Sequence, residues 1–391
     1  MLHVTSLLDD KYDGVLMVGI HGIGGVGKTT IAREVYNLIA DQFEWLCFLD
    51  NVRENSIKHG LVHLQKTLLS KTIGESSIKL GSVHEGIPII KHRFHLKKVL
   101  LVIDDVDDLN QLQATVGGTD WFGSASRVII TTRDKHLLTC HGVTSTYEVD
   151  GLNKEEALKL LSGTAFKIDK VDPCYMRILN RVVTYASGLP LALMVIGSNL
   201  FGKSIEEWES SIDQYERIPN KKIQGVLKVS FDSLEEDEQQ IFLDIACCFK
   251  GYALTYVKEI LSTHHNFCPE YAIGVLIDKS LIKVDADRVI LHDLIEDMGK
   301  EIVRQESPRE PGKRSRLWFP DDIVEVLEEN KVRLIYSWVG FSKCNYSSVS
   351  NLSMAMLFCY LLLSFHDMQP SVHMYVKFQT YMCCGLLVLL S

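Results

Sequence analysis

Short apolar runs and helical patterns alternate along the first 150 residues. The runs at residues 15–20, 99–103 and 128–130 are continuous and not alternating, as expected of strands that are covered on both faces of a parallel sheet. After the first run, apolar residues recur at helical spacing at Ile31, Val35, Leu38 and Ile39. This spacing predicts a helix with one stripe against the sheet. The first part of the chain therefore predicts an α/β fold, a parallel sheet with flanking helices.

Helical patterns dominate the rest of the chain as far as residue 330. Asn153 followed by Glu156 has the spacing of a helix-capping pair, and so has Ser233 followed by Glu236. No repeat with a period of 20 to 50 residues is visible, which argues against a solenoid.

A hairpin pattern follows the helices of this region. Apolar residues first recur at helical spacing at Ile241, Ile245, Cys248 and Phe249. Residues 280–284 and 289–291 then predict two short strands on either side of residues 285–288. A helix followed by a hairpin is typical of a winged-helix unit. We expect the adjacent Cys247 and Cys248 to lie in the core of this unit, because free cysteine packs as a small hydrophobic side chain.

Length and composition are those of a globular protein. The chain has 391 residues, enough for two or three domains of about 100 to 200 residues each. Hydrophobic residues make up 46% and charged residues 23%, and the net charge of −9 argues against nonspecific nucleic-acid binding. The ten cysteines include no CxxC pair, and the N-terminus has no secretory signal pattern. We therefore expect a cytoplasmic location, with the nucleus as a further one.

Charge almost disappears after residue 331. In residues 332–391 the only acidic or basic side chains are Arg333, Lys343, Asp367 and Lys377. The apolar runs at residues 354–363 and 382–390 are shorter than the roughly 20 residues that a membrane-spanning helix needs. We expect no membrane span, and the tail is either poorly folded or a peripheral anchoring segment.

The segment GIGGVGKT at residues 22–29 has the pattern of a phosphate-binding loop. Its glycines let backbone amides turn around an anion at the start of a helix. Lys28 adds a positive charge for the outer phosphates, and Thr29 offers a hydroxyl to Mg²⁺. A strand before the loop and a helix after it argue against a glycine-rich turn without function. The residues predicted here to bind a purine nucleoside diphosphate or triphosphate are Gly22, Gly24, Gly25, Val26, Gly27, Lys28, Thr29 and Thr30.

Polar residues follow the other two predicted strands. Asp104 is predicted to hold Mg²⁺ through water, and Asp105 to orient or deprotonate the attacking water, with a capping or solvated role as the alternative for this pair. Arg133 follows Thr131 and Thr132. Its planar fork can bind two phosphate oxygens, so we predict that it senses the terminal phosphate, with a surface ion pair as the alternative. His264, His265 and Cys268 lack the fourth donor that a tetrahedral metal site needs.

Residues 12–331 resemble the NB-ARC module, the nucleotide-binding module of plant disease-resistance proteins. Besides the phosphate loop, the resemblance rests on CFLDNVRE at 47–54, DDVD at 104–107, VIITTRD at 128–134, GLPLA at 188–192, FLDIAC at 242–247 and LHDL at 291–294. Asp107 and residues 301–327 are typical of the subclass that carries an N-terminal Toll/interleukin-receptor domain.

The resemblance implies a signalling switch, at most a slow ATPase, in which ADP holds a closed state and ATP opens the module for oligomerisation. It places Pro190 near adenine, and it assigns His292 to stabilising the ADP state by donating from a neutral imidazole to a phosphate oxygen. Partners would be copies of the chain or related resistance proteins. The implied organisation is a P-loop domain at 1–150, a helical domain at 151–222, a winged-helix domain at 223–315, the start of a linker at 316–331, and the atypical tail.

Several positions depart from the family pattern. Leu291 stands where methionine is most common, a swap of similar volume, and Gly163 and Thr164 replace bulkier residues. The chain begins about a dozen residues before the first strand, so we expect weaker nucleotide retention. Val332 and Arg333 can be encoded by a splice-donor sequence, which suggests that residues 332–391 are intron-derived. Two further hypotheses are a noncatalytic truncated adaptor or decoy of full-length relatives, and a metabolic P-loop kinase or ATPase.

Overall fold

The computed structural model describes residues 2–8, 12–74, 79–166, 173–265, 268–328 and 338–339. The chain divides into two units, Met1–Gly340 and Phe341–Ser391. The second unit, and with it nearly all of the predicted apolar tail, lies outside the described residues.

The first part of the chain contains a five-stranded parallel sheet with the strand order β2-β3-β4-β1-β5. The predicted strands correspond to β1 (Leu16–His21), β3 (Val99–Val106) and β4 (Arg127–Thr132). Two strands were not predicted from periodicity, β2 (Trp45–Leu49) and β5 (Ser145–Glu148). The segment STYE of β5 has no apolar run because it is an edge strand whose residues are half-buried or exposed.

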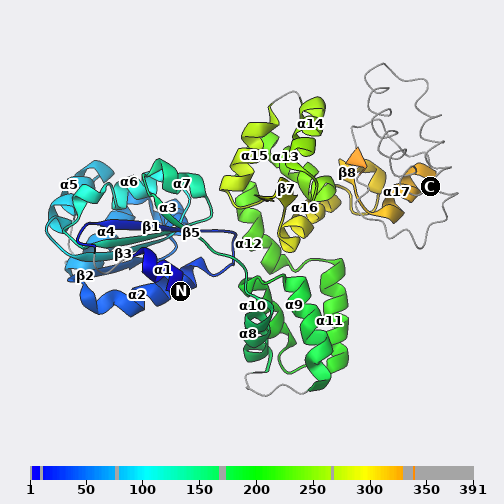
Figure 1. Cartoon of the computed structure of the whole chain (residues 1–391), viewed down its shortest axis with the longest axis horizontal. Coiled ribbons are helices and arrows are strands. Elements are labelled where there is room, and N and C mark those ends of the chain that lie inside the picture. The colour runs from blue at the N-terminus through cyan, green and yellow to red at the C-terminus, as the bar shows by residue number, and fades with distance from the viewer. Residues whose placement is uncertain are drawn as a thin grey trace. The chain divides into compact units, whose positions relative to one another are not determined.

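Helices cover both faces of this sheet (Figure 1). The helices α1 (Leu2–Leu7) and α2 (Lys28–Ile39) lie on one face. On the other lie α3 (Val52–His59), α4 (Leu61–Ile73), α5 (Val83–Phe94), α6 (Leu109–Thr115) and α7 (Lys135–Cys140). Alternate strand residues belong to different clusters: Leu100 and Val102 join the cluster of α2, and Leu101 and Ile103 join that of α3 to α7. This two-sided burial explains the continuous apolar runs.

The apolar stripe of α2 differs at one position from the prediction. Val35 and Ile39 are buried and Ile31 is half-buried, but Leu38 is 65% exposed. Ala32 completes the buried stripe instead. At 100° per residue Ala32 lies on the same side as Val35 and Ile39, whereas Leu38 lies on the opposite flank of the stripe.

Helices make up most of the remaining described chain. They are α8 (Lys154–Phe166), α9 (Met176–Ala186), α10 (Pro190–Leu200), α11 (Ile205–Arg217), α12 (Lys221–Asp232), α13 (Glu236–Asp244), α14 (Leu254–His264), α15 (Pro269–Asp278), α16 (Asp293–Glu306) and α17 (Pro320–Glu328). The short strands β8 (Arg316–Leu317) and β9 (Trp338–Val339) pair in parallel. Short single-turn helices are η1 (Ala40–Gln42), η2 (Thr119–Trp121), η3 (Pro173–Tyr175), the π-helix η4 (Ile245–Phe249) and η5 (Pro311–Lys313).

One predicted helix start is confirmed and one is wrong. The Asn153 side chain accepts from the backbone N–H of Glu156 at 3.0 Å, and the Glu156 carboxylate accepts from that of Asn153 at 3.1 Å. Ser233 does not cap α13, because α12 runs to the residue before it and its hydroxyl donates to the Ser230 carbonyl at 2.9 Å. Helix α13 begins after Glu235, whose N–H donates to the Glu238 carboxylate at 2.9 Å.

The predicted hairpin is confirmed with shorter strands, β6 (Lys283–Asp285) and β7 (Arg288–Ile290), which pair antiparallel. Ala286 and Asp287 join them with positive φ of 45° and 60°, as a two-residue turn between right-twisted strands requires. The apolar positions predicted before it are all buried, Cys247 and Cys248 included.

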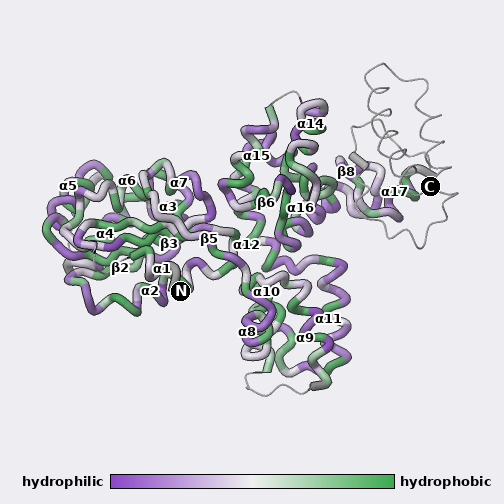
Figure 2. The backbone as a smooth tube through the Cα atoms, in the orientation of Figure 1, coloured by the Kyte–Doolittle hydropathy of each residue, from purple (hydrophilic) through white to green (hydrophobic). Residues whose placement is uncertain are grey.

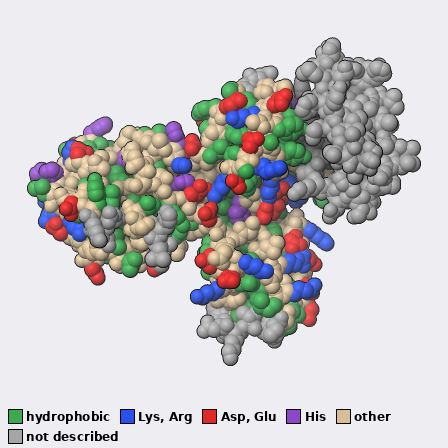
Figure 3. Space-filling view, viewed as in Figure 1, with side chains coloured by type: hydrophobic (Ala, Val, Ile, Leu, Met, Phe, Trp, Pro, Cys, Tyr) green, Lys and Arg blue, Asp and Glu red, His purple; other side chains and the backbone are tan. Residues whose placement is uncertain are grey.

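The hydrophobic core continues from the sheet into the helices. One cluster joins the α2 face of the sheet to buried residues of every helix from α8 to α16, and in Figure 2 the strands and the inner sides of these helices carry most of the hydrophobic colour. On the face shown in Figure 3, acidic and basic side chains are interspersed over the helical region. No helix within the described part of the chain has the length and apolarity to cross a membrane.

Candidate nucleotide-binding site

The phosphate loop, residues 22–29, joins β1 to α2 at the carboxyl edge of the sheet. Gly22, Gly25 and Gly27 have φ of 144°, 81° and 103°, values that L side chains rarely adopt. A Cβ atom on Gly25 would also lie 2.6 Å from the Leu191 Cβ. The glycine pattern that predicted the loop therefore reflects both its backbone conformation and its close packing.

Lys28 lies across this loop. Its ammonium donates to the carbonyls of Gly22 at 2.7 Å and Ile23 at 2.9 Å. Burial lowers the pKa of Lys28 to about 7, and the Arg133 guanidinium acts in the same direction while Asp105 and Asp104 oppose it. An anion bound at the loop would reverse this shift, because an opposite charge favours the ammonium form.

Thr29 and Asp104 meet as a pair of oxygen donors. Asp104, at the end of β3, is buried, and its Oδ1 accepts from the Thr29 hydroxyl at 2.8 Å and from the Thr131 hydroxyl at 2.7 Å. A hydroxyl and one carboxylate are the donors that Mg²⁺ takes from a protein when phosphates supply the rest. The described residues include no group of three or more His, Cys, Asp and Glu side chains that could hold a metal ion. The donor set thus fits Mg²⁺ shared with a nucleotide.

Asp105 lies at an irregularity of β3, where the register to β4 shifts between Ile103 and Val106. Its φ of 58° is unusual for a residue with a side chain. Its carboxylate is bracketed by two guanidinium groups: Arg53 Nε donates to Oδ2 at 2.9 Å, and Arg133 Nε lies 3.6 Å from Oδ1. The prediction missed Arg53, although it stands in the CFLDNVRE segment.

Arg133 contacts more than this carboxylate. Its Nη1 donates to the Val226 carbonyl of α12 at 2.6 Å, and the same nitrogen would lie 2.6 Å from a Cβ on Gly24. The Arg133 side chain is only 17% exposed. Its ion pair with Asp105 is therefore not at the surface, unlike the surface ion pair that the sequence offered as an alternative role. The structure therefore brings Arg133 to the phosphate loop, to Asp105 and to α12.

Pro190 and Leu191 bring the start of α10 to the loop. Pro190 is the first residue of the helix, and the Leu191 N–H donates to the Gly25 carbonyl at 3.2 Å. A Cβ on Gly27 would lie 4.0 Å from Pro190 Cγ. The predicted adenine contact of Pro190 stays a prediction, and its position beside the loop agrees with it.

His292 caps the first turn of α16. Its Nδ1 accepts the N–H of Leu294 at 3.2 Å, and its Nε2 lies 3.0 Å from the Ser187 carbonyl. Burial lowers the pKa of His292, and a neutral ring that accepts at Nδ1 carries its proton on Nε2. The one N–H of the ring is therefore directed to Ser187 in this structure, and the predicted bond to a phosphate oxygen stays a prediction.

Asp293, the next residue, binds the same turn between α9 and α10, which we call the α9–α10 corner. Its carboxylate accepts from the Ser187 hydroxyl at 2.8 Å and from the Lys250 ammonium. Ser187 lies between α9 and α10 with a positive φ of 48°. Two side chains at the start of α16 thus bind one residue at the α9–α10 corner.

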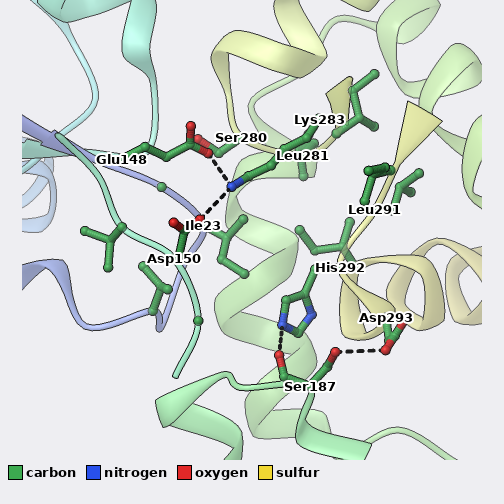
Figure 4. Close-up of a pocket in the computed structure, with 17 residues that line it drawn as sticks. Ile23, Glu148, Asp150, Ser187, Ser280, Leu281, Lys283, Leu291, His292 and Asp293 are labelled. Atoms are coloured by element: carbon green, nitrogen blue, oxygen red, sulfur yellow. Dashed lines mark hydrogen bonds and ion pairs between the residues drawn. The ribbon is translucent and has the colours of Figure 1, made fainter. Parts of the chain in front are cut away.

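A pocket of about 270 Å³ lies between the phosphate loop and the winged-helix residues (Figure 4). Lys283 of β6 closes one side through ion pairs with Glu148 at 2.6 Å and Asp150 at 3.2 Å. Further along the same boundary, the Ser280 hydroxyl donates to the Arg133 carbonyl at 3.3 Å. The lining includes Gly22, Ile23, Val26, Ser187, Leu281 and His292.

Comparisons with known proteins agree with this architecture. The NB-ARC domain model matches residues 3–170, and the model described as "Disease resistance protein Roq1-like, winged-helix domain" matches residues 235–307. A Walker-type ATPase from Pyrococcus abyssi has a similar fold, with a TM-score of 0.51, 14% identity, and coverage of 76% of this chain and 93% of that one.

Plant resistance proteins are similar along most of the chain. Disease resistance protein RPV1 of Vitis rotundifolia is 46% identical over 80% of this chain, and TMV resistance protein N of Nicotiana glutinosa is 40% identical over 84% of it. The chain spans 22% and 29% of the length of these two relatives. With its phosphate loop, its parallel sheet and its winged helix, the chain carries an NB-ARC domain and a Roq1-like winged-helix domain, and it is similar to plant disease-resistance proteins over most of its length.

Proposed function

We propose that this protein is an ADP- and ATP-binding signalling switch of plant innate immunity, with ADP in the off state and ATP in the on state. The observation that carries the proposal is the pocket that the phosphate loop shares with His292 and Leu281 of the winged helix. A ligand in this pocket would touch both, so its identity can bias how they pack. The names of the similar resistance proteins support the immune context.

Each site residue has a role in this proposal. Lys28 binds the outer phosphates, and Thr29 and Asp104 hold Mg²⁺, which neutralises phosphate charge when bound. Asp105 orients the attacking water of a slow hydrolysis that resets the switch. Arg133 reads the terminal phosphate and reports to α12, which its Nη1 contacts through Val226. Pro190 packs near adenine.

The proposal extends to organisation and surroundings. The P-loop, helical and winged-helix domains are placed at 1–150, 151–222 and 223–315, followed by the start of a linker at 316–331. Copies of the chain or related resistance proteins are the proposed partners, with no specific nucleic acid. The proposed location is the cytoplasm, extending to the nucleus.

Release of bound nucleotide tests the switch directly. The purified protein is denatured, and the supernatant is analysed by chromatography for adenine and guanine nucleotides. We expect near-stoichiometric ADP, because a pocket between packed regions should retain its ligand. Lys28→Ala, checked for folding by circular dichroism, serves as the control and should release none. A wild-type protein that is empty and takes up no ADP would refute the proposal.

A further inference from the structure

We propose that Arg53 is a positioning residue for Asp105, holding this carboxylate in place while Arg133 responds to the terminal phosphate. The inference rests on the proposed function, since it concerns the hydrolysis step of the same site. Asp105 has two arginine neighbours, and the structure distinguishes them by distance and by what else they contact.

Arg53 is the closer neighbour and belongs to the same domain as Asp105. It is the second residue of α3, which begins three residues after β2, and β2 pairs with β3. Its Nε donates to Asp105 Oδ2 at 2.9 Å, and the two side chains are 25% and 20% exposed. At the backbone, the Asp105 N–H donates to the Thr131 hydroxyl at 2.8 Å. One bond therefore fixes the Asp105 main chain, and Arg53 fixes the carboxylate.

Arg133 is less suited to this anchoring role. Its Nε is 3.6 Å from Asp105 Oδ1, and its shortest hydrogen bond, 2.6 Å, goes to the Val226 carbonyl of another domain. Its guanidinium also lies against Gly24 of the phosphate loop. A side chain with these contacts changes position when nucleotide or α12 moves, so a carboxylate held by Arg133 alone would move as well.

Because Arg53 binds only one of its carboxylate oxygens, Asp105 can still act on water through the other. A carboxylate offers about four lone-pair directions on its two oxygens, and Arg53 engages Oδ2 only. Oδ1 faces the Arg133 side and keeps acceptor capacity when Arg133 turns to a phosphate. Within the described residues, no hydrogen bond or ion pair of Arg53 reaches the phosphate loop. Removing Arg53 should therefore change the rate of hydrolysis and leave nucleotide affinity nearly unchanged.

Single-turnover hydrolysis separates these effects. Protein preloaded with radiolabelled ATP is given Mg²⁺, and phosphate release is followed while ADP and ATP affinities are measured by calorimetry. We expect R53A to hydrolyse about tenfold more slowly or worse, because a misplacement near 1 Å can cost up to about 100-fold, with affinities within about twofold of wild type. R53K should lie between R53A and wild type. K58A, which removes a lysine paired with Glu54 on the same helix, should behave as wild type.

A double-mutant cycle excludes a merely structural role. If Arg53 acts through Asp105, adding R53A to D105A should slow hydrolysis no further. R53M, which keeps most of the aliphatic stem, replaces R53A throughout if R53A loses cooperative unfolding. A wild-type rate in R53A, a rate in D105A equal to wild type, or an equal further loss in the double variant would overturn the role of Arg53 while ATP binding and the proposed switch survive. Failure of the wild type to bind ADP or ATP would refute the switch, and this inference with it.

Discussion

The contact of Asp293 with Ser187 gives the sharpest test of how the winged helix affects nucleotide retention. Asp293→Ala removes the acceptor of the Ser187 hydroxyl and one of two carboxylates around Lys250, which also contacts Glu296. Burial opposes ionisation of Asp293, but the hydrogen bonds from Lys250 and Ser187 outweigh it and hold the pKa of Asp293 below its usual value. The carboxylate is therefore charged at neutral pH and binds both donors.

The size of the effect follows from these two contacts. The Asp293 side chain is 56% exposed, so its ion pair with Lys250 contributes about 0 to 1 kcal/mol. The hydrogen bond from the Ser187 hydroxyl adds about 1 kcal/mol. Losing both should weaken the packing of α16 on the α9–α10 corner by about 1 to 2 kcal/mol, or about 5- to 30-fold in the equilibrium.

Release of a fluorescent ADP analogue measures this weakening. If opening of the winged helix precedes ADP release, the dissociation rate of Asp293→Ala should rise by about 5- to 30-fold. Ser187→Ala should give a smaller increase, and the double variant should match Asp293→Ala because both changes remove one hydrogen bond. Asp285→Ala, which changes an exposed carboxylate in β6, is the control. A release rate in Asp293→Ala within twofold of wild type, or strictly additive effects, would refute the coupling.

Three further predictions concern charged groups, two of the proposed site and one in α16. Lys28→Ala should weaken ADP binding at least about 100-fold in calorimetry, because it removes a charge-assisted phosphate contact; unchanged affinity would contradict the site. Asp297→Asn should raise the melting temperature more at pH 7.5 than at pH 4, because burial raises the pKa of Asp297 to about 6 and the resulting loss of stability builds up between the ordinary pKa of about 3.9 and about pH 6; an equal gain at both pH values would contradict this. His292 has a lowered pKa, so its contribution to the closed form should be complete above about pH 6.5, the ordinary value, and lost as pH falls. ADP release should accelerate below that pH when it is measured in the Asp297→Asn variant, where Asp297 no longer titrates. A release rate that stays constant down to pH 5.5 would contradict this role of His292.

The sequence predicted the parts of the site that one sheet edge brings together. The phosphate loop, Asp104 and Arg133 each follow a buried apolar run, and carboxyl ends of parallel strands meet at one edge, so their proximity follows from topology. Thr29 and Asp104 are 75 positions apart in the chain, and the two runs predicted that both lie at this edge, but not the hydrogen bond between them.

Other contacts carry no signal in periodicity or spacing. Ser187 binds α16 because its backbone adopts a left-handed conformation between two helices, and nothing in a Ser-Gly pair specifies a partner 106 positions away. The contact of Arg53 with Asp105 is likewise not predicted by the sequence pattern, because it depends on where α3 directs the Arg53 side chain. The error at Ser233 arose because two helix ends lie within a few residues, and the preceding helix uses the hydroxyl first.

The contacts that the phosphate-loop region makes with β6 and with α12 differ in strength. Lys283 and its partners Glu148 and Asp150 are 46%, 42% and 84% exposed, so each pair contributes at most about 1 kcal/mol and is weakened by salt. The bond from Arg133 to the Val226 carbonyl is charge-assisted and largely buried, and such bonds contribute about 1.5 to 3 kcal/mol. Added salt should therefore weaken the ion pairs of Lys283 and leave the hydrogen bond of Arg133 to Val226 in place. Because Arg133 also lies against Gly24, a terminal phosphate would draw on the same guanidinium that binds α12. On the proposed function, the nucleotide would therefore act on α12 through this arginine, and the exposed lysine contacts would adjust how readily β6 separates from the sheet.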